Sequence, residues 1–78
     1  MSSVMEAKYL VVIERAADGS YSAYVPDLPG CVSCGDTVDE LKVMIQEAIV
    51  FHLEGMHAAG LRIPKPSTTA DYVSASFV

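Results

Sequence analysis

The side chains of this 78-residue sequence that could do chemistry include two cysteines and two histidines. Cys31 and Cys34 form a C-x-x-C pair, which in redox proteins lies at a helix start, where the dipole lowers a thiol pKa. Here the pair falls in a predicted strand, on which residues three apart point to opposite faces. Zinc would need two more ligands, and His52 and His57 point in different directions on a helix. We therefore expect no metal and no cofactor.

Three aspartates, Asp27, Asp36 and Asp39, are candidate ligands for a divalent ion. Their neighbours favour turn and helix-capping roles instead, because aspartate beside proline, glycine and threonine is typical of such positions. No phosphate-binding glycine loop is present, and no spacing indicates a catalytic triad. We do not expect an enzyme. A small-molecule or metal-dependent enzyme built on Asp27, Asp36, the cysteines and His52 stays open as an alternative.

The composition indicates one small domain with more apolar surface than it can bury. Apolar residues make up 51% of the sequence, yet a chain of this length buries only about 60–65% of its unfolded surface. Small domains often gain stability by association, and surplus apolar surface favours it. We therefore expect a homo-oligomer, either a dimer or a tetramer.

The charge and hydropathy patterns restrict the partners. The net charge is −5, which repels a phosphate backbone and favours a basic protein partner. We expect no direct nucleic-acid binding by this chain. No apolar run approaches the ~18 residues that span a bilayer, and the first residues lack the pattern of a signal peptide. These features predict a cytoplasmic protein that does not bind membranes.

The chain divides into a predicted flexible tail over residues 1–6 and a single domain over residues 7–78. The first strand is apolar on both faces, which indicates a central strand or one covered on both sides. Asp18-Gly19 is a hairpin signal between the first two strands. The last segment alternates apolar and polar residues, as a half-buried strand does. Strands are predicted over residues 7–15, 20–25, 31–34 and 70–78.

A proline-rich corner and a long helix complete the pattern. Pro26 and Pro29 lack amide donors, so a sheet ladder cannot continue through them, and Gly30 allows a sharp reversal. The run from Thr37 to Glu40 is a capping box that starts a helix, which we expect from about Val38 to Ala59, ended by Gly60. The order β-β-β-α-β predicts an α+β two-layer fold with a mostly antiparallel sheet and one long helix.

The helix has an apolar face for the sheet and an outer face that is not wholly polar. At 100° per residue, Val43 and Val50 align on the outer face beside a row of glutamates. A solvated acidic face with two ordinary exposed valines is one interpretation; a contact surface for a partner is the other. The core face comprises Val38, Leu41, Ile45, Ala48, Ile49, His52 and Met56. The candidate partner-binding residues are Glu40, Val43, Glu47, Val50 and Glu54.

The run from Tyr21 to Leu41, YSAYVPDLPGCVSCGDTVDEL, resembles the signature of the HicB-like antitoxins, small proteins of bacterial and archaeal toxin–antitoxin pairs. The resemblance continues in Glu47 to Glu54 and in Gly60 to Pro66, and covers about residues 8–75. It implies the HicB amino-terminal domain, a partial RNase H-like fold. The structural positions of the motif are Pro26, Asp27, Pro29, Gly30, Gly35 and Thr37.

The resemblance also implies a function. HicB-type antitoxins bind and neutralise HicA-type toxins, small basic proteins that cut mRNA, and an acidic antitoxin suits a basic toxin. Many of them carry a carboxy-terminal DNA-binding domain, for which 78 residues leave no room. The expected function is therefore toxin neutralisation by protein–protein contact, without catalysis. An orphan oligomerising domain is the alternative.

Overall fold

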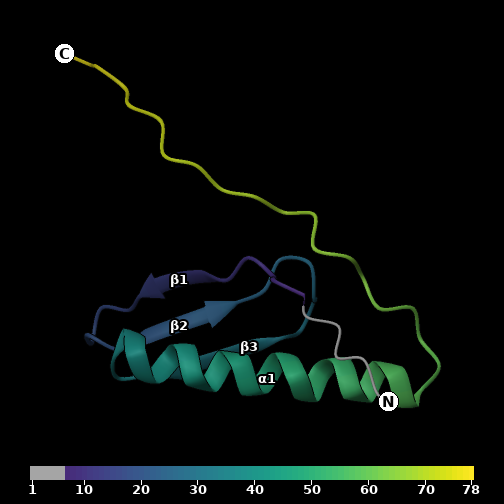
Figure 1. Cartoon of the computed structure of the whole chain (residues 1–78). Helices are drawn as coiled ribbons and strands as arrows, with labels where there is room; N and C mark the ends of the chain where they lie inside the picture. Colours follow the sequence, from purple (N-terminus) through teal and green to yellow (C-terminus); the bar gives the residue numbers. More distant parts are fainter. Residues whose placement is uncertain (1–6) are drawn as a thin grey trace.

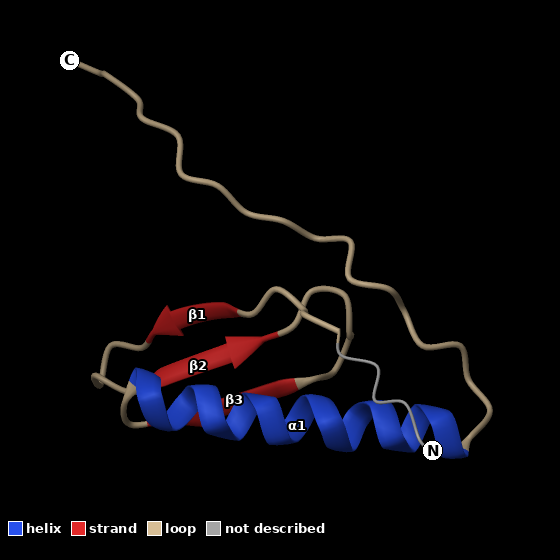
Figure 2. Cartoon of the chain, in the orientation of Figure 1, coloured by secondary structure: helices blue, strands red, loops and turns tan. Residues whose placement is uncertain are grey.

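The computed structural model of the protein describes residues 7–78, in which three short strands precede one long helix. The sheet is antiparallel in the order β1-β2-β3, and the helix lies across one of its faces (Figures 1 and 2). This arrangement confirms the predicted α+β class. The tail expected over residues 1–6 lies outside the described residues. The elements are β1 Val12–Arg15, β2 Tyr21–Tyr24, β3 Val32–Gly35 and α1 Val38–Ala58.

The hairpin between β1 and β2 turns at Asp18-Gly19, as the sequence predicts. Gly19 has a φ of 89°, which glycine adopts without steric cost. The Ser20 amide and hydroxyl both donate to Asp18 Oδ1, at 2.9 and 2.6 Å. At the hairpin end of the ladder Arg15 pairs with Tyr21, and its guanidinium carbon lies 5.8 Å from the ring centroid.

The segment between β2 and β3, residues 25–31, consists of two linked turns, and we call it the corner. The Leu28 amide donates to the Val25 carbonyl at 3.0 Å, and the Cys31 amide donates to the Leu28 carbonyl, also at 3.0 Å. Gly30 has a φ of 87°, so the second turn has proline and then a positive-φ glycine at its centre, as a type II turn requires. The corner points the Leu28 side chain inward, where it is fully buried.

The helix begins and ends at the predicted signals. The Glu40 amide donates to Thr37 Oγ1 at 3.1 Å, which caps the first turn. At the other end Gly60 has a φ of 71°, and its amide donates to the His57 carbonyl while the Leu61 amide donates to the Met56 carbonyl. This pair of bonds is a Schellman motif. Within residues 7–78, no helix combines the length and the apolar content that a membrane span needs.

The core lies between α1 and the β2–β3 half of the sheet. The predicted helix face points inward, but only its first half is fully buried, at Leu41 and Ile45; its other members are half-buried. Gly35 lets β3 approach the helix, because a Cβ there would lie 3.3 Å from the Leu41 amide nitrogen. The buried residues are Ala23, Val25, Leu28, Cys31, Leu41 and Ile45.

Two expectations about the sheet are corrected. The first strand is shorter than predicted, and it is an edge strand rather than a central or doubly covered one. Residues 70–78, predicted as a fourth strand, are extended but belong to no sheet. A strand persists only where a neighbouring strand satisfies its backbone groups, and beyond residue 68 the chain leads away from the domain (Figure 1).

We predict that Leu28→Ala lowers the free energy of unfolding by roughly 2–5 kcal/mol, because it removes a fully buried side chain from a small core. Leu61→Ala is the matched control. Leu61 is 58% exposed, so this variant should lose less than about 1 kcal/mol. Urea titration followed by circular dichroism measures both values, and equal losses would contradict the role assigned to Leu28.

Candidate protein-binding surface

The outer face of α1 carries three rows of side chains, each with a seven-residue spacing, which is nearly two helical turns. Glutamates form the central row. Val43 and Val50 form a row on the side of β1, and Met44 and Phe51 form a row on the side of β3. We call this set the outer helix face; its glutamates are Glu40, Glu47 and Glu54.

The apolar members of the outer helix face are exposed. Val43 is 56% exposed, Val50 49% and Phe51 79%. All three glutamates are exposed as well. A shallow hollow in this face is lined by Gln46, Glu47, Val50, Phe51 and Glu54. The sequence-predicted partner residues therefore lie on one continuous surface, although their contact with a partner stays a prediction.

The electrostatics of the outer helix face are anionic. Its central row of carboxylates is joined by Asp39 in the first turn of α1, and the lysine of this region, Lys42, lies on the side turned toward β1. Apolar side chains bordered by carboxylates match a partner that presents apolar side chains ringed by lysine or arginine.

The residues considered for metal or redox chemistry are not brought together. Cys31, just before β3, is buried, whereas Cys34 in β3 is exposed, and both are free thiols. Burial raises the pKa of the Cys31 thiol. His52 is half-buried on the inner side of α1. Across residues 7–78 no group of three or more His, Cys, Asp or Glu side chains is placed to hold a metal ion.

Asp27 has a role that the sequence analysis missed. Its carboxylate accepts four hydrogen bonds from residues 40 and 41 positions further along the chain. The Ser67 amide and hydroxyl donate at 2.9 and 3.0 Å, and the Thr68 amide and hydroxyl donate at 3.0 and 2.7 Å. These bonds lower the pKa of Asp27 to about 2, and the bond from the Thr68 hydroxyl has the largest effect. The corner thereby holds the chain that follows the helix.

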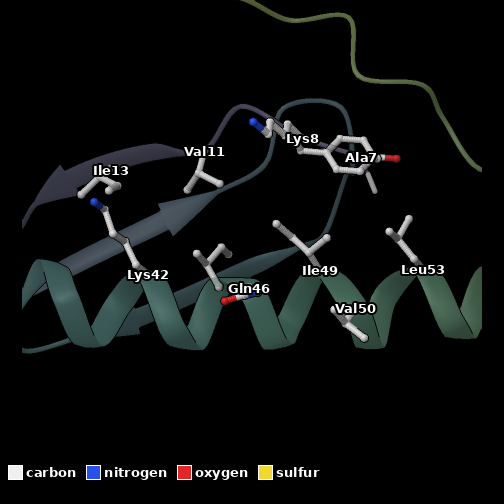
Figure 3. Close-up of a pocket in the computed structure, with 11 residues that line it drawn as sticks. Ala7, Lys8, Val11, Ile13, Lys42, Gln46, Ile49, Val50 and Leu53 are labelled. Atoms are coloured by element: carbon white, nitrogen blue, oxygen red, sulfur yellow. The ribbon is translucent and has the colours of Figure 1, made fainter. Parts of the chain in front are cut away.

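A second feature that the sequence did not predict is a groove between β1 and α1, shown in Figure 3. It exists because α1 covers β2 and β3 but not β1. Val11 and Ile13 line it from the first strand region, Ile49 and Leu53 from the helix, and Lys8 and Lys42 lie at its border (Figure 3). Its volume is about 1030 Å³.

The sequence matches a known protein family and several relatives. Residues 9–76 match the family described as HicB-like antitoxin of bacterial toxin–antitoxin system. The chain is 42% identical over 66 residues to an uncharacterized 14.9 kDa protein of Haemophilus phage HP1, covering 85% of this chain and 49% of that protein. It therefore spans about half the length of the phage relative.

Shorter relatives match over more of their own length. A UPF0150 protein of Synechocystis sp. is 42% identical over 73% of this chain and 72% of its own. A UPF0150 protein of Thermoplasma acidophilum is 40% identical over 74% of this chain and 84% of its own. The chain belongs to the HicB-like antitoxin family, which confirms the resemblance seen in the corner and helix motifs.

The four hydrogen bonds that Asp27 accepts from Ser67 and Thr68, which we call the Asp27 tie, should depend on pH. Because the folded pKa of Asp27 is lowered from 3.8 to about 2, the tie stabilises the folded state above pH ~4 and is lost as the pH falls through about 2. We predict that the Ser67 and Thr68 amide resonances titrate with a midpoint near pH 2 in two-dimensional NMR spectra.

The matched variants are Asp27→Asn, which should abolish this titration, and Asp36→Asn, which should leave it intact because Asp36 is an exposed aspartate outside the tie. A midpoint near pH 4, or the same titration in Asp27→Asn, would show that the carboxylate of Asp27 does not hold residues 67 and 68.

Proposed function

We propose that this chain neutralises a HicA-type toxin by binding it through the outer helix face. The observation that carries the proposal is membership of the HicB-like antitoxin family together with a helix face on which exposed apolar and acidic side chains alternate in rows. An antitoxin of this kind acts by covering its partner, so the chemistry it needs is complementary contact rather than catalysis.

The charge balance supports a basic partner. The chain carries ten acidic and five basic residues, a net charge of −5, and three of the acids form the central row of the outer helix face. Opposite charge on the toxin accelerates encounter and orients it. Desolvation of the exposed Val43, Val50 and Phe51 supplies affinity once the faces meet, because fully burying such a side chain contributes about 1.5–3 kcal/mol.

We further propose that the chain is not an enzyme, acts in the cytoplasm and does not itself bind nucleic acid. One of the three candidate metal ligands, Asp27, uses its carboxylate to hold Ser67 and Thr68. Cys31 is buried, and its raised pKa keeps the thiol protonated near neutral pH. The excess of acidic residues opposes contact with phosphate backbones.

We predict that Val43→Asp weakens binding to a HicA-type toxin more than tenfold, because it places an unpaired charge in the contact. Glu47→Lys should weaken it about two- to tenfold, mainly through slower association, and less at high salt. Isothermal titration calorimetry gives the equilibrium constants and stopped-flow fluorescence the association rates. The toxin used in both measurements is the product of a short, basic reading frame adjacent to the gene.

The control variants carry the same types of substitution on the sheet. Val32 is 64% exposed on β3 and Glu14 is exposed on β1, so Val32→Asp and Glu14→Lys should bind the toxin like the unaltered chain. Circular dichroism checks that every variant is folded. If the control variants lose affinity and the helix variants keep it, the contact lies on the sheet, and the outer helix face is not the binding site.

A further inference from the structure

The segment of residues 70–78 has the pattern of a strand but no sheet to join in its own chain. Tyr72 is fully exposed, Val73 is 88% exposed and Phe77 is 93% exposed. The segment runs extended away from the domain (Figures 1 and 2). Exposure of this many apolar side chains on an extended backbone is characteristic of a segment that pairs with another surface.

Among the described strands β1 and β3 each have one free edge, and the edge of β1 is the better candidate for an added strand. Among the described residues β1 pairs with β2 alone, yet residues 7–15 have the doubly apolar composition of a covered strand. Beneath this edge lies the groove of Figure 3, whose walls include Val11, Ile49 and Leu53. A strand added beside β1 would satisfy its free backbone groups and roof the groove at the same time.

The segment and the groove are complementary in pattern and charge. Side chains of a strand alternate between its faces, so Val73, Ala75 and Phe77 share one face and can all turn toward the apolar groove. Ser74 and Ser76 then face water. The only charged residue of the segment, Asp71, is acidic, whereas the groove is bordered by Lys8 and Lys42.

The hydrogen bonds of the preceding residues direct the segment outward. Asp27 holds Ser67 and Thr68 beside the corner, and the Tyr9 hydroxyl donates to the Pro64 carbonyl. From this anchored point the chain departs from its own sheet (Figure 1). The Cα radius of gyration is 15.3 Å, against roughly 11–12 Å for a compact chain of this length, so the segment reaches well beyond the domain that carries it.

A reciprocal exchange would bury apolar area at two equivalent contacts. Aromatic side chains bury about 150–250 Å² each. Phe77 from two copies thus contributes roughly 300–500 Å², before Val73, Ala75 and the groove itself are counted. Specific interfaces start near 1,000–1,200 Å² in total. The strand backbones, the remaining apolar side chains and the groove walls of both copies supply the rest of the interface.

We propose that residues 70–78 of one copy add as a fourth strand to the β1 edge of a second copy, with Phe77 in the second copy's groove, and that the exchange is reciprocal. The occupant of the groove is therefore a second molecule of this chain. The exchange requires no toxin, so it is tested on the purified 78-residue chain alone. Its failure would leave the proposal of toxin binding through the outer helix face unaffected.

The first experiment compares Phe77→Asp with its neighbour Ser76→Asp by analytical ultracentrifugation over a range of concentrations. The unaltered chain should be dimeric. Phe77→Asp should weaken self-association at least 100-fold, because one buried aromatic side chain per copy leaves the interface. Ser76→Asp should dimerise like the unaltered chain, because its side chain faces water. A monomeric unaltered chain, or equal effects of both variants, would overturn the proposal.

The second experiment tests whether residues 70–78 occupy the groove of their own chain or the groove of the second copy. Dimers mixed from ¹³C-labelled and unlabelled chains are examined by isotope-filtered NOE spectroscopy, which detects contacts between chains only. Contacts between the Phe77 ring and the Val11 and Ile49 methyl groups are expected across chains. The same contacts found only within one chain would mean that the segment folds back on its own sheet, and their complete absence would mean that the groove stays open; either result overturns the exchange.

Discussion

Burial of Leu28 is the interaction on which the rest of the structure depends. Two successive turns carry this side chain into the only described cluster of buried residues, together with Leu41 and Ile45 of α1. The corner thereby joins the sheet to the helix and sets the direction in which β3 departs. Gly35 then brings the end of β3 against the first turn of α1.

The small size of this core explains where apolar surface remains. Its residues are contributed by β2, the corner and the first half of α1, so the second half of the helix and the β1 edge are only partly covered. Apolar side chains consequently remain exposed on the outer helix face, beside the groove and along residues 70–78. A domain with so little interior can gain stability by association, which the proposed strand exchange would supply.

Asp27 connects the core to these outer surfaces. It lies in the first of the two turns of the corner, and its carboxylate accepts four hydrogen bonds from Ser67 and Thr68. Because the charged form of the carboxylate accepts all four, its pKa is lowered to about 2, and the tie stays intact at physiological pH. A single charge in the corner therefore fixes the point from which the last residues leave the domain.

Local signals in the sequence determined much of this protein: the α+β class, the Asp18-Gly19 hairpin, the Thr37 cap, the Gly60 stop and the inward face of α1. Each depends on residues within one or two turns of one another, so spacing alone predicts them. The motifs of the corner and the helix also indicated the family. The outer helix face was predicted as well, because helical periodicity places its rows without reference to the rest of the chain.

Tertiary structure alone decided the rest. The burial of Leu28, the tie from Asp27 to Ser67 and Thr68, and the groove beside β1 join residues far apart in sequence, and no local pattern marks such pairs. The same holds for the last nine residues. Their alternation correctly indicates an extended segment with an apolar side, but whether such a segment becomes a strand depends on where an unpaired sheet edge lies. That position is set by the folded arrangement of the whole chain, and within residues 7–78 no free sheet edge lies beside them.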